Sequence, residues 1–138
     1  MKFEGIYTPV ITPYRDDYSI DYDRLAEIVD FLIEAGVHGI ISAGTTGEYY
    51  AQTMEERFEL MKFIKQRVKG RTGYIVGTGA IRTEDSIEYA KAAVEVGADA
   101  LLVATPPYAL PTERENALHA LAIDRVANLP ILLYNYPD

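Results

Sequence analysis

The sequence predicts an α/β fold, and specifically a (β/α)8 TIM barrel of which this chain supplies the first four strand–helix units and a fifth strand. Five apolar runs rich in β-branched residues alternate strictly with four patterns of helical period. Such alternation is typical of a parallel sheet whose strands are joined by crossover helices. The centres of successive runs lie about 30 residues apart, so eight units need roughly 245 residues, close to the ~250 of a typical barrel.

Each expected strand is a short apolar run followed directly by Gly or Pro, which is typical of a buried strand that leads into a turn. The five strands are expected at Ile6–Thr12, His38–Ala43, Tyr74–Thr78, Ala100–Thr105 and Ile131–Tyr136. The side chains expected to face the barrel interior include Val10, Ile40, Ile75, Leu101 and Leu132.

Four connecting helices are predicted from apolar residues that recur with a period near 3.6. Their stripes are Leu25, Ile28, Val29, Leu32 and Ile33 in the first; Phe58, Met61, Ile64 and Val68 in the second; Ile87, Ala90 and Val94 in the third (83–96); and Leu118, Leu121 and Ala122 in the fourth. The second and fourth helices open with Thr53-x-x-Glu56 and Thr112-x-x-Glu115. Both patterns predict a capping box, in which threonine and glutamate satisfy free amide donors reciprocally.

A weak internal repeat supports the same unit. Residues 34–41 resemble residues 95–102, and in both copies we expect a glycine, Gly36 or Gly97, to end a helix in the left-handed conformation. An open sheet of five parallel strands, as in flavodoxin-like folds, is the structural alternative. Such a fold normally ends with a helix over its last strand, and none is predicted here. We therefore expect 1–138 to be the N-terminal half of a single barrel domain whose C-terminal half is absent.

Composition excludes several classes of function. The net charge of −8 provides no basic surplus for nucleic acid or an anionic membrane. The absence of cysteine excludes disulfides and thiolate metal sites and is compatible with the cytoplasm, where we expect the protein. The sequence shows no signal peptide and no apolar run of transmembrane length. Neither a paired carboxylate nor a histidine cluster accompanies the strand ends, so no metal and no cofactor is expected.

Ligands of both architectures meet the C-terminal ends of the strands. The segment Gly44-Thr45-Thr46-Gly47 follows the second strand, and its backbone N–H groups and hydroxyls could form a concave site for a carboxylate. The alternative is a tight turn in which the threonines bond their own backbone.

Two tyrosines are further candidates at the strand ends. Tyr134, on the fifth strand, could relay protons, because a phenol both donates and accepts them. A core tyrosine with one satisfied hydroxyl is the alternative. Tyr108 follows two prolines on a loop, where it could cover the barrel rim or mediate a subunit contact.

Two other kinds of site find little support. Gly77-Thr78-Gly79 does not complete the dinucleotide fingerprint, because Arg82 stands where the third glycine belongs. Four lysines, Lys62, Lys65, Lys69 and Lys91, are expected on helices. None is expected at a strand end, where a desolvated amine could attack a ketone.

Five motifs in the same order resemble the dihydrodipicolinate synthase / N-acetylneuraminate lyase family. They are Ile11–Pro13, Gly44–Glu48, Gly77–Gly79, Thr105–Tyr108 and Leu133–Pro137. The resemblance implies a (β/α)8 barrel in which pyruvate forms a Schiff base with a lysine on strand six. It also implies that this chain stops before that lysine, so that the 138 residues alone are inactive.

The resemblance assigns roles to individual residues. Thr45 and Thr46, between Gly44 and Gly47, look like the pyruvate-carboxylate site, with Thr45 also in a hydroxyl relay. Tyr134 looks like the proton-transfer tyrosine, and Tyr108 like the tyrosine that a neighbouring subunit inserts to complete the relay.

Substrate class and assembly follow from the same resemblance. The partners implied are pyruvate or another 2-oxo acid, an aldehyde, and further copies of the chain in a dimer or tetramer. Gly-Thr-Thr-Gly-Glu favours condensation of the 4-hydroxy-tetrahydrodipicolinate synthase type. Tyr49 stands where small residues are usual and is expected to reshape the pocket of the second substrate. A sugar-acid lyase or dehydratase of the same family is therefore the alternative, and a non-catalytic half-barrel module is the rival from another class.

Overall fold

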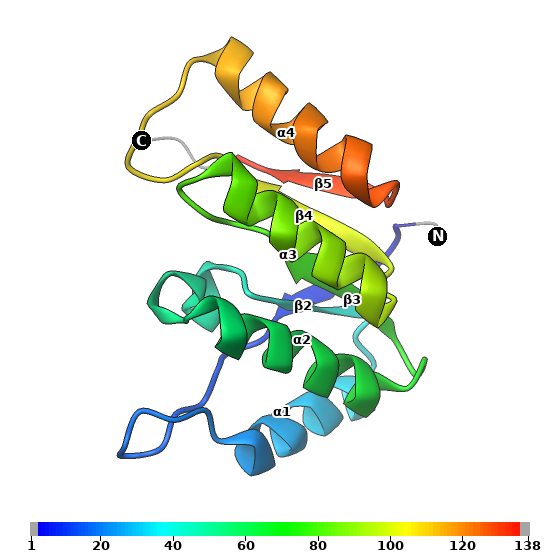
Figure 1. Ribbon diagram of the computed structural model, residues 1–138. Coiled ribbons are helices and arrows are strands. Elements are labelled where there is room, and N and C mark those ends of the chain that lie inside the picture. Colours follow the sequence, from blue (N-terminus) through cyan, green and yellow to red (C-terminus); the bar gives the residue numbers. More distant parts are fainter. Residues whose placement is uncertain (1–2, 136–138) are drawn as a thin grey trace.

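The computed structural model describes residues 3–135, which form one curved parallel sheet with helices on its outer side (Figure 1). The elements are β1 (Tyr7–Pro9), α1 (Tyr22–Glu34), β2 (Gly39–Ser42), the short 3₁₀ turns η1 (Thr45–Gly47) and η2 (Tyr49–Ala51), α2 (Met54–Val68), β3 (Gly73–Gly77), α3 (Thr83–Val96), β4 (Ala100–Ala104), α4 (Glu113–Ala127) and β5 (Ile131–Tyr134). The strand order is β1-β2-β3-β4-β5, and every neighbouring pair is parallel.

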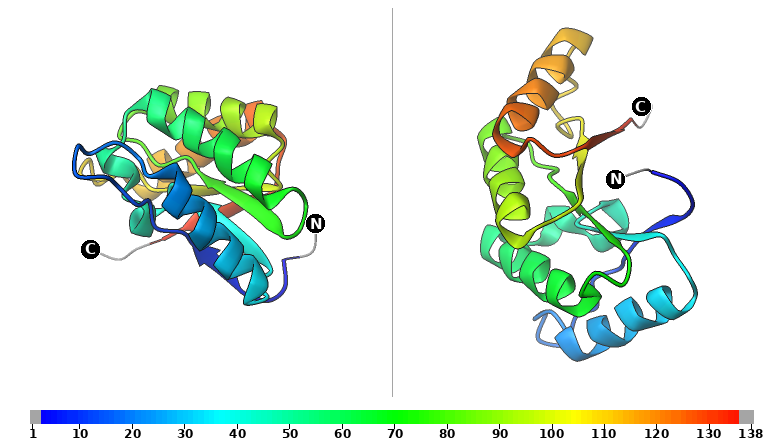
Figure 2. Two further views of the ribbon diagram at one scale, coloured as in Figure 1. Left: turned by 90° about the horizontal axis from the view of Figure 1, so that it is seen from below. Right: turned by 90° about the vertical axis from the view of Figure 1, so that its right-hand side faces the viewer.

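This topology confirms the predicted fold class. The sheet curls and the helices cover its convex side only, as the right-hand view of Figure 2 shows. A flavodoxin-like sheet has the strand order 2-1-3-4-5 and helices on both faces, so the alternative architecture is wrong. The five strands and four helices are the N-terminal part of a TIM barrel. Strand β1 is shorter than expected, and Tyr136, at the end of the fifth expected strand, lies outside the described residues.

The apolar core is divided between the two faces of the sheet. The larger cluster lies between the sheet and the helices and includes Val10, Ile40 and Leu101. The smaller cluster lies on the other face of the sheet and is built on Ile41, Ile75 and Ala100, with Tyr7, Leu102 and Leu132 packed against it. The prediction of inward-facing residues was therefore wrong for Val10, Ile40 and Leu101, which pack toward the helices. Parallel strands buried on both faces carry no alternation from which the inner face could be chosen.

Helices α1 and α2 bury the stripes predicted for them. Leu25 and Val29 of α1 and Met61, Ile64 and Val68 of α2 are buried. The remaining members of the two stripes, Ile28, Leu32, Ile33 and Phe58, pack partly buried against the same cluster. Both capping boxes are present, at Thr53 with Glu56 and at Thr112 with Glu115. Gly36 and Gly97 have φ of 82° and 79°, as expected for glycines that end helices.

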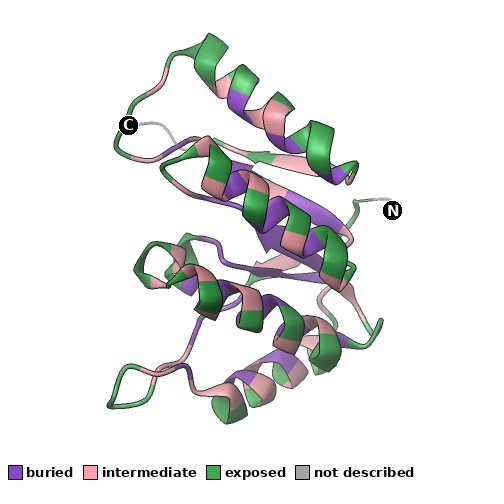
Figure 3. Cartoon of the chain, viewed as in Figure 1, coloured by how far each residue is buried: buried purple, intermediate pink, exposed green. Residues whose placement is uncertain are grey.

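The buried faces of α3 and α4 differ in part from the predicted ones. On α3, Ala90 is buried and Ile87 packs partly buried against the core as predicted, but Val94 is exposed, and Ser86, Tyr89 and Ala93 are also buried. On α4, Leu118 and Leu121 are 55% and 48% exposed, whereas His119, Ile123 and Ala127 are buried. The apolar pattern missed one polar residue on each inner face, Ser86 on α3 and His119 on α4, and a hydrogen bond with the Thr83 hydroxyl compensates the burial of His119. Figure 3 shows the burial concentrated on β2–β4 and on the helix faces turned toward them.

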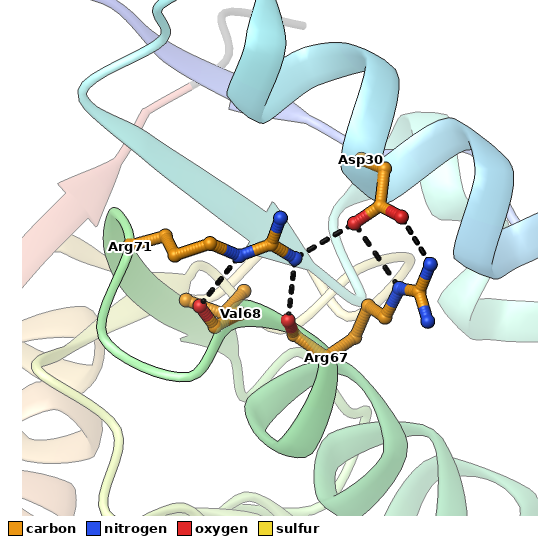
Figure 4. Close-up of polar contacts among 4 residues, drawn as sticks. All are labelled: Asp30, Arg67, Val68 and Arg71. Atoms are coloured by element: carbon orange, nitrogen blue, oxygen red, sulfur yellow. Dashed lines mark hydrogen bonds and ion pairs between the residues drawn. The ribbon is translucent and has the colours of Figure 1, made fainter.

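A carboxylate on α1 ties that helix to the end of α2 (Figure 4). Asp30 accepts hydrogen bonds from both Arg67 and Arg71, and the one from Arg71 Nη2 measures 2.7 Å. Arg71 also donates to the carbonyl oxygens of Arg67 and Val68, which closes the last turn of α2. Hydrogen bonds from Arg67 and Arg71 lower the pKa of Asp30. In residues 3–135, no helix is long and apolar enough to cross a membrane.

Candidate functional site

The loop after β2 places two threonines at the C-terminal edge of the sheet. Ala43 turns the chain with φ of 53°, Gly44 follows in an extended conformation, and Thr45–Gly47 form a 3₁₀ turn. Gly47 and Glu48 donate the hydrogen bonds of this turn, to Gly44 O and Thr45 O respectively. The N–H groups of Thr45 and Thr46 precede those donors and remain directed out of the turn, as at the start of any helix.

The Thr45–Thr46 turn presents its donors to solvent. Both threonine side chains are exposed. Among the hydrogen bonds of the described residues, none joins either hydroxyl to the backbone of the turn. The sequence-based alternative, in which the threonines satisfy their own backbone, is thus not what the structure shows. Exposed N–H groups and hydroxyls at one turn form a site suited to an anion such as a carboxylate.

The segment that follows β1 and the residue Gln52 hold this turn in place. The hydroxyl of the buried Thr12 donates to Gly47 O at 2.8 Å, and Gln52 Nε2 donates to the same oxygen at 2.9 Å. Gln52 also donates to Thr12 Oγ1 and to the Tyr14 hydroxyl. A Cβ at Gly47 would lie 3.0 Å from Val10 O, a tight contact that glycine avoids. The position of the turn is therefore set by three neighbouring segments.

Tyr134 is brought to the same edge by the register of β5. It pairs with Ala104, two residues after the pair of Leu102 with Leu132, whose side chains belong to the inner cluster. Since strand side chains alternate, Tyr134 lies on the inner face of the curved sheet. A cavity of about 380 Å³ lies on the helix-covered side of the sheet, between the ends of β4 and β5 and the first turns of α4, and Tyr134 is among the residues that line it.

Tyr108 lies on the loop between β4 and α4, which follows the C-terminal end of β4. Its side chain is 94% exposed, so it does not cover the rim within this chain. Ala109 N–H donates to Pro107 O, and Tyr108 lies between them at φ of 69°, which makes a γ-turn of the rare positive-φ kind. Strained conformations of this sort concentrate at binding and catalytic sites.

Tyr49 packs against the loop after β3. Its ring packs edge-on against Tyr50, and a Cβ at Gly79 would lie 2.9 Å from it. The Arg57 guanidinium lies 5.5 Å from the ring centre. The bulk of Tyr49 is therefore accommodated by the loop after β3, and its predicted contact with the second substrate stays a prediction.

Four lysines lie within helices or directly after one, as the sequence predicts. Lys62 and Lys65 lie within α2, Lys69 directly follows that helix, and Lys91 lies within α3, so none of these four is at the C-terminal end of a strand. His119 is buried on α4, and its Nδ1 lies 2.9 Å from the Thr83 hydroxyl. Burial lowers the pKa of His119.

Sequence reasoning missed Arg57. This arginine of α2 is only 2% exposed, and it donates to the carbonyl oxygens of Gly77 and Gly79, each at 2.7 Å. A signal was present, because Arg57 stands four residues before Met61 on the buried stripe of α2. Among residues 3–135, no group of three or more His, Asp or Glu side chains is arranged to hold a metal ion.

Comparisons with known proteins agree with this geometry. A sequence model described as "Dihydrodipicolinate synthetase family" matches residues 2–138. The 4-hydroxy-tetrahydrodipicolinate synthase of Methanocaldococcus jannaschii is 42% identical over 136 residues, which are 99% of this chain and 47% of that protein. The chain thus spans about half the length of the curated relatives it matches.

Solved structures extend the similarity to three dimensions. The chloride-inhibited dihydrodipicolinate synthase from Acinetobacter baumannii, complexed with pyruvate, superposes with a TM-score of 0.94 at 38% identity, over 99% of this chain and 47% of that one. N-acetylneuraminate lyase from Mycoplasma synoviae superposes with a TM-score of 0.91 at 32% identity, over 98% and 47%. Both similarities cover nearly all of this chain.

Proposed function

Because this chain belongs to the dihydrodipicolinate synthetase family, we propose that it is the carboxylate-binding half of a pyruvate-dependent class I aldolase or lyase. The observation that carries the proposal is the exposed Thr45–Thr46 turn at the C-terminal end of β2. Two unused N–H groups and two hydroxyls there match the acceptor oxygens of a 2-oxo acid. The crystallised complex of the similar A. baumannii enzyme with pyruvate supports this substrate class.

The second half of the barrel supplies the amine in this proposal. A lysine on strand six attacks the ketone carbon of the bound 2-oxo acid, water leaves, and a Schiff base forms. This chain would contribute binding and proton transfer. Thr45 and Thr46 hold the carboxylate, while Gly44 and Gly47 allow the turn to form. Tyr134, on the inner face near the same edge, moves protons to and from the reacting atoms.

The exposed Tyr108 belongs to an assembly of copies in this proposal. A side chain that is 94% exposed on a strained turn can reach a neighbouring subunit, where its hydroxyl would complete the relay through Thr45 to Tyr134. The expected assembly is a dimer or tetramer, located in the cytoplasm. No cofactor or metal is assigned a role.

The second substrate in this proposal is an aldehyde. Condensation of pyruvate with an aldehyde, of the 4-hydroxy-tetrahydrodipicolinate synthase type, is the leading reaction. Cleavage or dehydration of a sugar acid is the second candidate, favoured by the similarity to N-acetylneuraminate lyase.

Trapping with borohydride tests the proposal. We define the complete barrel as the polypeptide in which residues 1–138 are followed by their second half. It should form a reduced adduct with pyruvate, and Thr46→Val should weaken adduct formation by about tenfold through loss of one hydrogen bond to a charged ligand. Thr72→Val, at the opposite end of the sheet before β3, is the control. Absence of an adduct with the wild-type complete barrel would refute the proposal.

A further inference from the structure

A buried cation of α2 binds the end of β3 and the loop that follows it. Arg57 is 2% exposed, and its two terminal nitrogens donate to Gly77 O and Gly79 O at 2.7 Å. Its guanidinium lies 3.4 Å from the centre of the Tyr89 ring. No carboxylate within salt-bridge distance of Arg57 is found in the described part of the chain. Burial without an acidic partner lowers the pKa of Arg57, and its charge is balanced by carbonyl dipoles and aromatic faces.

Gly77, whose carbonyl oxygen Arg57 binds, lies against Ala43, two residues before Thr45. A Cβ at Gly77 would lie only 2.1 Å from Ala43 O, so the β3 end and the start of the β2–α2 loop are in closest backbone contact. Gly77 O belongs to the same peptide group as the N–H of Thr78, which donates to Leu102 O on β4 at 3.0 Å. A charge-assisted bond at Gly77 O polarises this peptide and strengthens the bond to β4.

We propose that Arg57 is a positioning residue, which holds the end of β3 against Ala43 so that the Thr45–Thr46 turn keeps its binding geometry. This inference rests on the proposed function of the turn. Only arginine fits the requirement, because its planar fork reaches two carbonyl oxygens while its face stacks on Tyr89. The single ammonium of lysine cannot do both. Arg57 would touch neither the substrate nor the reacting atoms.

The fork geometry predicts how binding responds to substitution. In the complete barrel, Arg57→Lys keeps the charge but loses one carbonyl bond and the stacked plane. We expect its KM for pyruvate to rise about tenfold or more, because displacement of a binding group by about 1 Å is costly. The kcat at saturating pyruvate should change far less. Arg57→Met should raise KM at least as much as Arg57→Lys.

A second arginine of the same helix provides the matched control. Arg67→Met removes the bonds to Asp30 and loosens α1 from α2, but Arg67 contacts neither loop of the site. We expect it to lower the melting temperature and leave KM for pyruvate unchanged. If Arg57→Met does not fold, the comparison rests on Arg57→Lys and Arg67→Met.

The outcomes separate the two proposals. A wild-type barrel that forms no borohydride-trapped adduct with pyruvate refutes the proposed function. A wild type that is trapped, with a folded Arg57→Lys whose KM is that of the wild type, refutes the positioning role alone. Equal increases in KM for Arg57→Lys and Arg67→Met would also refute it, since general loosening of α2 would then be the cause.

Discussion

The substitution Gly77→Ala tests how closely the end of β3 must approach the loop after β2. The added Cβ would lie 2.1 Å from Ala43 O and 2.7 Å from Ala43 C, whereas ordinary contact begins near 3.4 Å. The two segments must therefore separate by roughly 1 Å or more. Because the opposing atoms are backbone, they cannot rotate away as a flexible side chain would.

This geometry sets the expected magnitudes. Overpacking of a dense interior costs about 1–3 kcal/mol, and an immovable backbone partner places Gly77→Ala near the upper end. We expect the free energy of unfolding of the complete barrel to fall by about 3 kcal/mol. Displacement of the Thr45–Thr46 turn by about 1 Å should also lower kcat/KM for pyruvate by up to ~10²-fold.

Gly44→Ala is the stability control for this prediction. Gly44 has φ of −85°, and a Cβ there would meet only Leu102 Cδ2, at 4.0 Å. Its substitution should change the free energy of unfolding by no more than about 0.5 kcal/mol. Urea unfolding of the two variants decides the matter. If Gly77→Ala is as stable as Gly44→Ala, the close approach is not a constraint and the reasoning fails.

Three further predictions follow from individual side chains. In the complete barrel, Tyr134→Phe should lower kcat by ~10²–10⁴-fold with little change in KM for pyruvate; unchanged turnover would mean the phenol only packs. The isolated 138-residue chain should yield no adduct with pyruvate in borohydride trapping. In sedimentation it should self-associate through the edges of β1 and β5 and through the exposed Leu118, Leu121 and Leu133. Burial lowers the pKa of His119, so the stability that its neutral form contributes is fully present above pH ~6.5 and falls as the pH drops toward the folded-state pKa. In His119→Gln, the melting temperature should therefore depend less on pH between about pH 7 and 5.

The architecture was predictable because its signals are carried by single segments. Runs of β-branched residues, the capping boxes at Thr53 and Thr112, and a spacing of about 30 residues each report on one unit. Which side of an element is buried depends on its neighbours instead. Ile40 and Ile41 are equally apolar, yet one faces the helices and the other faces the inner cluster. His119 is buried because Thr83, 36 residues earlier, supplies a partner for it.

The same reasoning predicts the candidate site residues, but it does not predict the residues that hold them in place. Thr45, Thr46 and Tyr134 follow from the rule that function gathers at the C-terminal ends of parallel strands. The orientation of Tyr49 and the burial of Arg57 do not, because both depend on where the loop after β3 runs. The sequence predicts the loop on which a residue lies, whereas packing between loops decides which way its side chain points.

The start of α2 is the common support of the site. Gln52, which holds Gly47 O, and Arg57, which holds the end of β3, flank Thr53, whose hydroxyl accepts from Glu56 N–H. Loss of a threonine cap costs typically about 1 kcal/mol, so Thr53→Ala should lower the stability of the complete barrel by this amount.

Thr112→Ala removes an equivalent capping box on α4, away from the turn, and should cost the same in stability. Only Thr53→Ala, however, loosens the backbone next to Gln52 and Arg57, two of the side chains that support the Thr45–Thr46 turn. We therefore expect the KM for pyruvate to rise severalfold in Thr53→Ala and to stay near the wild-type value in Thr112→Ala. Equal values of KM in two variants of matched stability would show that the turn keeps its geometry without help from α2.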